Sequence, residues 1–124
     1  MTKIQKTNID IVIPSWSKND ELFNITKKCL DSLFESEKNI SFHVYIIETN
    51  KDIEWNDHYS SLEEFNHTIT TLRPKLPFGY HKCLNQGRLA GISPYVVLCN
   101  NDITFENSWA SKIIWVMNSH PYIM

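Results

Sequence analysis

The 124-residue sequence has little cysteine and little glycine, with three of each, and it has no long apolar run. Cys29, Cys83 and Cys99 are far apart and odd in number, which argues against a zinc knuckle or a disulfide framework. No stretch approaches the ~18 apolar residues of a membrane span. Residues 1–6 are polar and lack the apolar core of a signal peptide. The sequence therefore predicts buried free thiols, no integral membrane segment and a cytoplasmic location.

An excess of positive charge is also missing. Twelve Lys and Arg stand against fourteen Asp and Glu, which gives a formal net charge of −2. Proteins that bind along a nucleic-acid backbone are expected to be basic, so we expect no nucleic-acid partner. Hydrophobic residues make up 42% and charged residues 21% of the chain, which argues against global disorder. The length fits a single domain over residues 1–124.

Several widespread catalytic motifs are absent too. The sequence has no Walker loop, no GxGxxG after a strand, no HExxH and no GxSxG. The five histidines have no metal-ligand spacing. The protein classes that depend on these motifs are therefore not indicated.

Four short apolar segments, rich in β-branched residues and bounded by turn residues, predict buried strands. They are residues 9–14 (IDIVIP), 42–47 (FHVYII), 67–72 (HTITTL) and 95–99 (YVVLC). Apolar stripes at helical spacing predict three helices, over residues 22–33, 80–90 and 109–117. We expect an N-terminal cap within residues 17–20 for the first helix, and at Asn107 or Ser108 for the last.

The alternation of strands and helices predicts an α/β protein with three layers, α/β/α, around a mostly parallel sheet. We expect the strand order 3-2-1-4. A ligand would then bind beyond the carboxyl ends of strands one and four, where the strand order reverses. A long loop of residues 49–65 separates strands two and three, and its Trp55, His58 and Tyr59 are more typical of packing than of ligand binding.

Residues suited to a nucleotide follow the predicted strands. Trp16 offers a flat face on which a base can stack, an interaction worth roughly 1–3 kcal/mol. Glu48 or Thr49 could accept an N–H from the base edge, Asn101 could bind sugar hydroxyls, and Asp102 offers a carboxylate to a hard cation. Each residue also has an ordinary explanation, namely aromatic packing, a solvated strand end or an Asn-Asn-Asp turn. The prediction therefore depends on their placement together.

The helix predicted over residues 80–90 could contribute to phosphate binding. Its N-terminus would point toward the same crevice, with His81 and Lys82 in the first turn. The ordinary alternatives are a solvated Lys82 and an Asn85 that bonds a neighbouring backbone group.

Four segments resemble, in order, the motifs of family 2 glycosyltransferases with the GT-A fold. Residues 9–20 (IDIVIPSWSKND) are similar to the opening strand and loop of that family, and residues 42–50 (FHVYIIETN) to its second strand. Residues 78–90 (FGYHKCLNQGRLA) resemble its helix with a G-x-x-x-x-x-N-x-G pattern. Residues 95–105 (YVVLCNNDITF) resemble the strand that ends in the DXD motif, in the Asn-Asn-Asp form of rhamnosyltransferase-like members.

The resemblance implies a Rossmann-like nucleotide-binding half that binds a UDP- or dTDP-sugar with Mn²⁺ or Mg²⁺. It implies transfer of the sugar, with inversion, to a hydroxyl acceptor. Asp102 would hold the metal against the diphosphate, and Trp16 would replace the usual stacking Tyr. The implied nucleotide-binding residues are Pro14, Ser15, Trp16, Glu48, Thr49, Lys82, Asn85, Asn100 and Asn101.

The sequence departs from the family pattern in three ways. The Asn-Asn-Asp form of the DXD motif keeps only one carboxylate. Glu48-Thr49 replaces the usual acidic pair after the second strand. Family members also continue into an acceptor-binding half that supplies a general base, and no segment here matches that half. The sequence therefore identifies no catalytic residue. The base would come from residues outside this sequence, from another subunit or from an unrecognised side chain of this chain. The acceptor site would come from a second copy of the chain or from a partner chain.

Three functions stay open. The first is a metal-dependent, hexosyltransferase-type glycosyltransferase, or its donor-binding half. The second is a non-catalytic module that binds a nucleotide or nucleotide-sugar, which the missing acceptor half favours. The third is a flavodoxin-like or regulatory α/β domain, in which Trp16 and Asp102 would be incidental.

Overall fold

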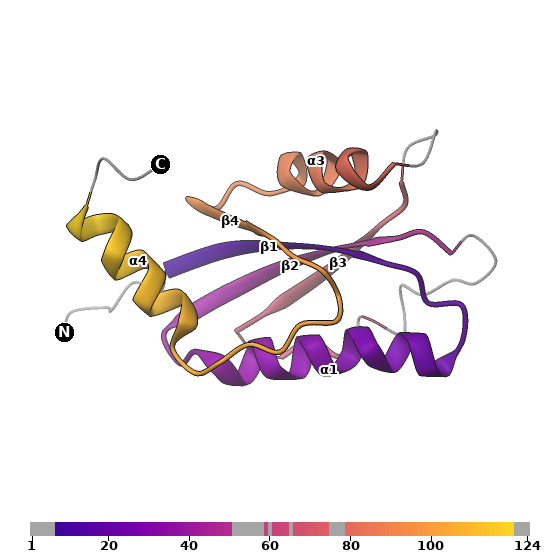
Figure 1. Cartoon of the computed structure of the whole chain (residues 1–124), viewed down its shortest axis with the longest axis horizontal. Coiled ribbons are helices and arrows are strands. Elements are labelled where there is room, and N and C mark those ends of the chain that lie inside the picture. The colour runs from indigo at the N-terminus through magenta and orange to yellow at the C-terminus, as the bar shows by residue number, and fades with distance from the viewer. Residues whose placement is uncertain (1–6, 51–58, 60, 65, 75–78, 121–124) are drawn as a thin grey trace.

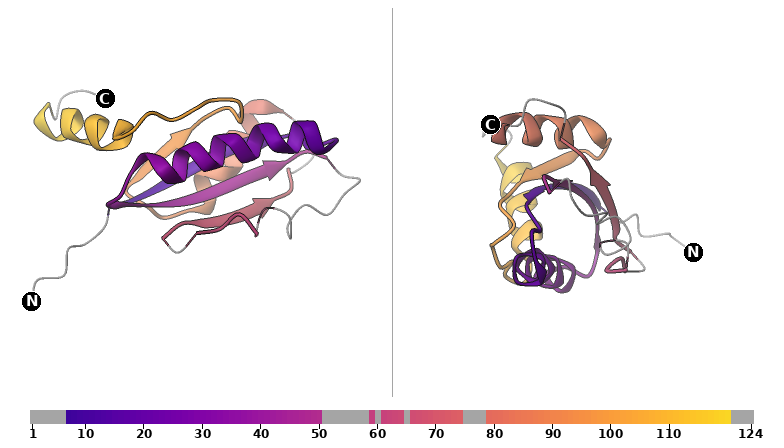
Figure 2. Two further views of the ribbon diagram at one scale, coloured as in Figure 1. Left: turned by 90° about the horizontal axis from the view of Figure 1, so that it is seen from below. Right: turned by 90° about the vertical axis from the view of Figure 1, so that its right-hand side faces the viewer.

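The computed structural model describes residues 7–50, 59, 61–64, 66–74 and 79–120. These residues form four strands and three helices, in the order β1 (Thr7–Ser15), α1 (Asp20–Ser36), β2 (Ile40–Glu48), β3 (Thr68–Leu72), α3 (Tyr80–Ala90), β4 (Tyr95–Leu98) and α4 (Trp109–Ser119). The helix α1 covers one face of the sheet and α3 the other (Figure 1). Figure 2 shows the same layers from two further directions. The predicted three-layer α/β/α architecture is confirmed.

The sheet is parallel throughout, and its strand order is β3-β2-β1-β4, as predicted. The pairing of β1 with β2 ends with Ser15 opposite Glu48. On the other side of β1, the pairing with β4 ends with Val12 opposite Leu98. The carboxyl ends of β2, β1 and β4 therefore meet at one end of the sheet.

The larger part of the apolar core lies between the sheet and α1. Alternate residues of β1 point to this side, and the isoleucines Ile9, Ile11 and Ile13 are almost completely buried there. Leu30 and Leu33 of α1 belong to the same cluster. The alternate residues of β1 and the apolar stripe of α1 that the sequence predicts therefore pack together in one core.

The start of α1 lies within the segment predicted to cap it. Asn19 is the N-cap, and its Oδ1 accepts a hydrogen bond from the amide of Leu22 at 2.9 Å. Asp20 and Glu21 place negative charge in the first turn, where the helix dipole stabilises it.

The opposite face carries a smaller apolar cluster of Val12, Ile47 and Cys83. Gly87 lies in the interior of α3, where glycine normally lowers helix stability. A Cβ at this position would overlap the side chain of Val12. Glycine is therefore needed here for the close approach of α3 to β1.

The helix α4 packs at the C-terminal end of α1 (Figure 1). Glu37, the residue after α1, accepts hydrogen bonds from the amide and the hydroxyl of Ser111, both at 2.7 Å. Ser108 is the N-cap of α4, but it has a left-handed backbone (φ 63°) and its side chain makes no capping bond. Of the two expected caps, Asn107 and Ser108, Ser108 occupies the N-cap position. The hydrogen-bond acceptor for the Ser111 amide in the first turn is the carboxylate of Glu37. None of the described helices is long and apolar enough to cross a membrane.

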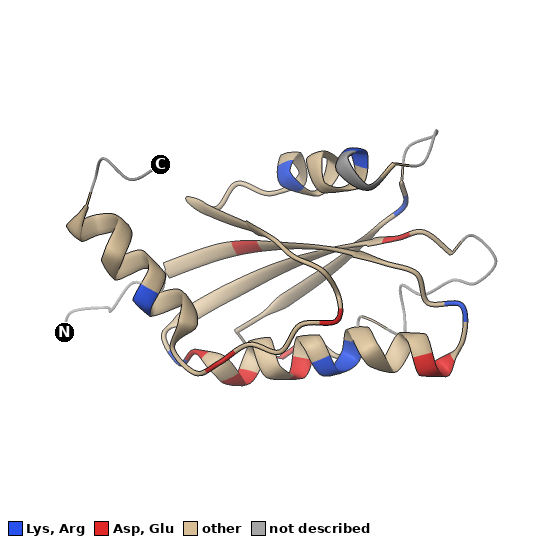
Figure 3. Cartoon of the chain, in the orientation of Figure 1, with Lys and Arg blue, Asp and Glu red and all other residues tan. Residues whose placement is uncertain are grey.

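The charged residues belong mainly to the helices and loops (Figure 3). The four strands contain only two residues of the Asp, Glu, Lys and Arg types, Asp10 in β1 and Glu48 in β2. Both carboxylates are buried. Burial removes them from water, so any carboxylate oxygen that lacks a protein donor costs free energy.

Candidate functional site

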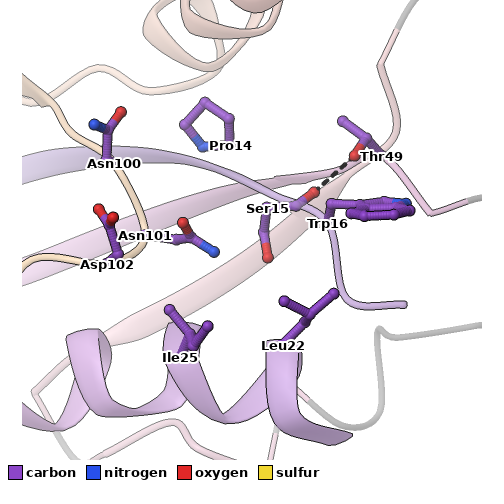
Figure 4. A pocket seen from close by; sticks show the side chains of 9 residues that line it. All are labelled: Pro14, Ser15, Trp16, Leu22, Ile25, Thr49, Asn100, Asn101 and Asp102. Carbon is purple, nitrogen blue, oxygen red and sulfur yellow. Dashed lines mark hydrogen bonds between the residues drawn. The ribbon is translucent and has the colours of Figure 1, made fainter. Parts of the chain in front are cut away.

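A pocket of about 390 Å³ opens at the carboxyl ends of β1 and β4 (Figure 4). Its lining comes from the end of β1, from α1 and from the loops after β2 and β4. The lining residues are Pro14, Ser15, Trp16, Leu22, Ile25, Thr49, Asn100, Asn101 and Asp102. Sequence reasoning predicts all of these except Leu22 and Ile25, whose apolar spacing indicates only a helix stripe. The strand order thus brings together residues that are up to 88 positions apart, from Pro14 to Asp102.

Trp16 and Asp102 lie on opposite sides of this pocket (Figure 4). The Trp16 side chain is 53% exposed, so its ring is open to a ligand. Lys18 Nζ lies 5.6 Å from the centre of the ring. Asp102 is exposed as well. A molecule with a flat ring at one end and negative charge bridged by a cation at the other would span the pocket.

Hydrogen bonds set the orientation of the polar lining residues. The amide and the hydroxyl of Thr49 both donate to the carbonyl of Ser15, at 2.8 and 3.0 Å. Asn101 Nδ2 donates to Thr26 Oγ1 at 3.0 Å, and the same hydroxyl lies 2.9 Å from Ser15 Oγ. Thr26 of α1 therefore connects the end of β1 with the loop after β4.

Glu48 is buried beside the pocket and is not among its lining residues. Its side chain is 0% exposed. Oε2 accepts hydrogen bonds from the amides of Ser17 at 2.9 Å and Asn50 at 3.0 Å, and Oε1 accepts one from the hydroxyl of Tyr59 at 2.8 Å. Both carboxylate oxygens are thus used inside the protein.

Tyr59 belongs to this polar network, although sequence reasoning interprets it as a packing residue. Its hydroxyl lies 2.6 Å from Ser17 Oγ and 3.1 Å from Ser15 Oγ, in addition to its bond to Glu48. Burial raises the pKa of Tyr59 above its ordinary value, and the charge of Glu48 adds to this. The phenol therefore keeps its proton at neutral pH and can donate it. A single aromatic residue in a polar loop has no periodicity that could reveal this role.

The two predicted residues on α3 do not line the pocket. Lys82 and Asn85 are exposed. Cys83 and Gly87 form the side of the helix that faces the sheet. The assignment of Lys82 and Asn85 to ribose or phosphate stays a prediction.

Asp102 is the one carboxylate among the residues that line the pocket. Asn100 and Asn101 add amide oxygens, which are accepted ligands of hard cations. Within the described part of the chain, no three His, Cys, Asp or Glu side chains are grouped to hold a metal ion. This donor set fits Mn²⁺ or Mg²⁺ that takes most of its ligands from phosphate and water. It does not fit a metal held by protein alone.

The fold is similar to that of two solved structures of TarS from S. aureus. For TarS 1–349 the TM-score is 0.64 at 13% sequence identity, and the match covers 93% of this chain and 33% of that one. For a second TarS structure the TM-score is 0.59 at 11% identity, with 93% and 20% covered. No protein-family model and no curated protein matches the sequence. The likeness shows that the fold is shared, and this chain spans a third or less of the length of those chains.

Proposed function

We propose that the chain binds a UDP- or dTDP-sugar together with Mn²⁺ or Mg²⁺. In this proposal it is a glycosyltransferase, or the donor-binding half of one, that transfers the sugar with inversion to a hydroxyl acceptor. The observation that carries the proposal is the pocket with Trp16 and Asp102 on opposite sides, at the strand ends where the order of the sheet reverses. TarS, which has a similar fold, is a glycosyltransferase.

Thr49 supports a uracil or thymine base. Its hydroxyl hydrogen is committed to the carbonyl of Ser15, so the oxygen is left to accept a hydrogen bond. The imide N–H of uracil or thymine is a donor that matches this acceptor. Trp16, on the same side of the pocket, offers the stacking face. Of the two acceptors predicted from the sequence, Glu48 and Thr49, the lining of the pocket favours Thr49.

The loop after β4 would bind the rest of the donor. Asn101 is held by Thr26 and can present its amide to ribose, with Asn100 beside it. Asp102 and the neighbouring amide oxygens would hold the cation, which when bound neutralises negative charge on the departing diphosphate. The residues of this chain thus bind and orient the donor.

The acceptor would be bound elsewhere. A general base must lie within hydrogen-bond reach of the acceptor hydroxyl, and the pocket lining offers no carboxylate besides Asp102. We assign the acceptor site to a partner chain or a second copy of this chain. The apolar residues exposed on β4 and α4 are of the kind that packs against another polypeptide. They include Val96, Leu98, Ile113, Trp115 and Val116.

A cytoplasmic location is part of the proposal. Cys29, Cys83 and Cys99 are buried and free. Free thiols are typical of a reducing compartment.

A binding titration tests the proposal. UDP, dTDP and UDP-glucose serve as probes, each with Mn²⁺ and with EDTA, against the parent chain and Asp102→Ala. We expect binding that requires Mn²⁺ and that weakens by about tenfold or more in the variant, because a charge-assisted metal contact is lost. Glu35→Ala removes an exposed carboxylate of α1 and is the matched control. Equal binding in EDTA and in Asp102→Ala would contradict the proposal.

A non-catalytic nucleotide-binding module is the second candidate. The lone carboxylate in the pocket lining favours it. Release of UDP from UDP-glucose, measured with a set of hydroxyl acceptors, separates the two candidates. Metal-dependent binding without UDP release supports the module, and acceptor-dependent release supports the enzyme.

A further inference from the structure

We propose that Glu48 and Tyr59 are positioning residues, a buried carboxylate–phenol pair that holds the loops after β1 and β2 in place without contacting the nucleotide. The inference rests on the proposed function for the identity of the ligand. Its structural part, the restraint of the two loops, stands on the contacts alone.

One oxygen of Glu48 connects the two loops. Oε2 accepts hydrogen bonds from the amide of Ser17, at 2.9 Å, and from the amide of Asn50, at 3.0 Å. Ser17 directly follows Trp16, and Asn50 directly follows Thr49. The same acceptor therefore fixes the residue after the proposed stacking group and the residue after the proposed base acceptor. A further bond, from Asn50 Nδ2 to the carbonyl of Ser17 at 2.8 Å, joins the loops directly.

Tyr59 fixes the other oxygen of Glu48. Its hydroxyl donates to Oε1 at 2.8 Å, and this leaves the phenol oxygen to accept from Ser17 Oγ, 2.6 Å away. Ser15 Oγ lies 3.1 Å from the same hydroxyl. Tyr59 therefore contacts Glu48 at the end of β2, Ser15 at the end of β1 and Ser17 in the loop after β1. It lies 11 residues beyond Glu48 in the sequence.

The burial of Glu48 indicates that it positions the loops and does not contact the nucleotide. Glu48 has no exposed surface and already accepts three hydrogen bonds, two of them from backbone amides. A base stacked on Trp16 would meet Thr49 at the pocket surface, with Glu48 outside the lining. A residue that acts in this way changes affinity for every nucleotide alike. A residue that reads the base changes the preference for one base over another.

Two mild substitutions test the pair. Tyr59→Phe removes one hydroxyl. Glu48→Gln keeps an acceptor oxygen for the two amides and offers its NH₂ to the phenol oxygen, but removes the charge. Tyr45→Phe removes a tyrosine hydroxyl from the opposite face of the sheet and is the matched control. The measurements are the dissociation constants of UDP, CDP, ADP and GDP with Mn²⁺, and the hydrogen-exchange rates of the Ser17 and Asn50 amides.

We expect Tyr59→Phe to weaken UDP binding by about tenfold, the effect of one hydrogen bond to a charged group. The ratio of the UDP constant to the constants of the other nucleotides should stay the same. Exchange of the Ser17 and Asn50 amides should become faster in both variants, and Tyr45→Phe should leave all of these values at the parent level.

Two results would overturn the inference. A changed ratio between nucleotides would show that the pair reads the base directly. Unchanged amide exchange in both variants would show that the pair does not hold the loops. If the parent chain binds no nucleotide at all, the proposed function fails, and the exchange rates still decide whether the pair restrains the loops.

Discussion

The two buried carboxylates of the sheet, Glu48 and Asp10, have very different surroundings. Glu48 lies on the α1 face at the carboxyl end of β2 and accepts three hydrogen bonds. Asp10 lies on the α3 face of β1 and is 1% exposed. Its Oδ2 accepts one long bond, 3.3 Å, from the amide of Ser93, and its Oδ1 has no partner among the described residues. Burial alone therefore does not show what a carboxylate does.

Glu48 and Asp10 differ in how many hydrogen-bond donors the protein places around them. Each carboxylate has a tyrosine nearby, Tyr59 for Glu48 and Tyr45 for Asp10. Only Tyr59 has a hydrogen bond to its carboxylate among the contacts of the described residues. Asp10 instead borders a cavity of about 300 Å³, lined also by His43 and Tyr45. We infer that Glu48 stabilises the fold, whereas Asp10 lowers its stability, because a buried polar atom without a partner costs free energy.

Glu48→Ala should have the largest effect on stability. The amides of Ser17 and Asn50 and the hydroxyl of Tyr59 would lose their acceptor together. We expect the free energy of unfolding to fall by about 3–5 kcal/mol. Urea denaturation measures this, with the exposed Glu35→Ala as the control, for which we expect a change within about 0.5 kcal/mol. A loss as small as that of the control would mean that the carboxylate is not needed by its three donors.

Gly91→Ala should have the next largest effect, at the other carboxylate. A Cβ on Gly91 would overlap Asp10 Oδ2 and lie 2.9 Å from Tyr45 Cε2. We expect overpacking to lower the free energy of unfolding by about 1–3 kcal/mol. In an Asp10→Ala background the same substitution should cost much less, because the overlapping carboxylate is gone. Additive costs in this double-mutant cycle would rule out the contact as the cause.

Conservative amides give the most direct comparison of the two sites. Glu48→Gln should lower the free energy of unfolding by about 1–2 kcal/mol, since charge-assisted bonds become neutral ones. Asp10→Asn replaces the unpartnered oxygen by an uncharged group and should leave stability unchanged or raise it by up to about 1 kcal/mol. Both variants can be measured by urea denaturation at pH 7. If Asp10→Asn costs more than Glu48→Gln, the contrast between the sites is wrong.

Most of the fold could be predicted from the sequence because it depends on periodicity. The helix α3 has the predicted bounds, Tyr80–Ala90, and the strand order and parallel sense are as expected. The strands β1 and β2 extend beyond the predicted segments, to Ser15 and Glu48. These residues pair with each other through the backbone, and backbone pairing does not require an apolar side chain. Strand ends are therefore less visible in a sequence than strand centres.

The candidate site could be predicted only where it depends on strand ends. Trp16, Thr49 and Asp102 each follow a strand, so the predicted strand order places them in one pocket. Tyr59 lies in a polar stretch of sequence without apolar periodicity, so no sequence pattern indicates its contact with Glu48. The difference between Glu48 and Thr49, neighbours in the sequence, depends on which side chain turns inward. Side chains of a strand alternate between its two faces, so the inward position of Glu48 can be predicted only if β2 is known to extend to residue 48.

The two tyrosines extend the comparison to alkaline pH, where we expect the smallest effect. Burial raises the pKa of Tyr59 and of Tyr45, with a nearby carboxylate, Glu48 or Asp10, as a further cause in each case. A group whose pKa is raised by folding contributes stability that is fully present below its unfolded value, about 10, and is lost as the pH rises through the folded value. Tyr59→Phe should therefore be less stable than the parent at pH 8, and the difference should narrow above pH 10. The narrowing should be smaller for Tyr45→Phe, because Tyr45 is only partly buried. Urea denaturation between pH 8 and 12 measures both differences, and parallel curves for Tyr59→Phe and the parent would show that the buried phenol does not titrate with unfolding.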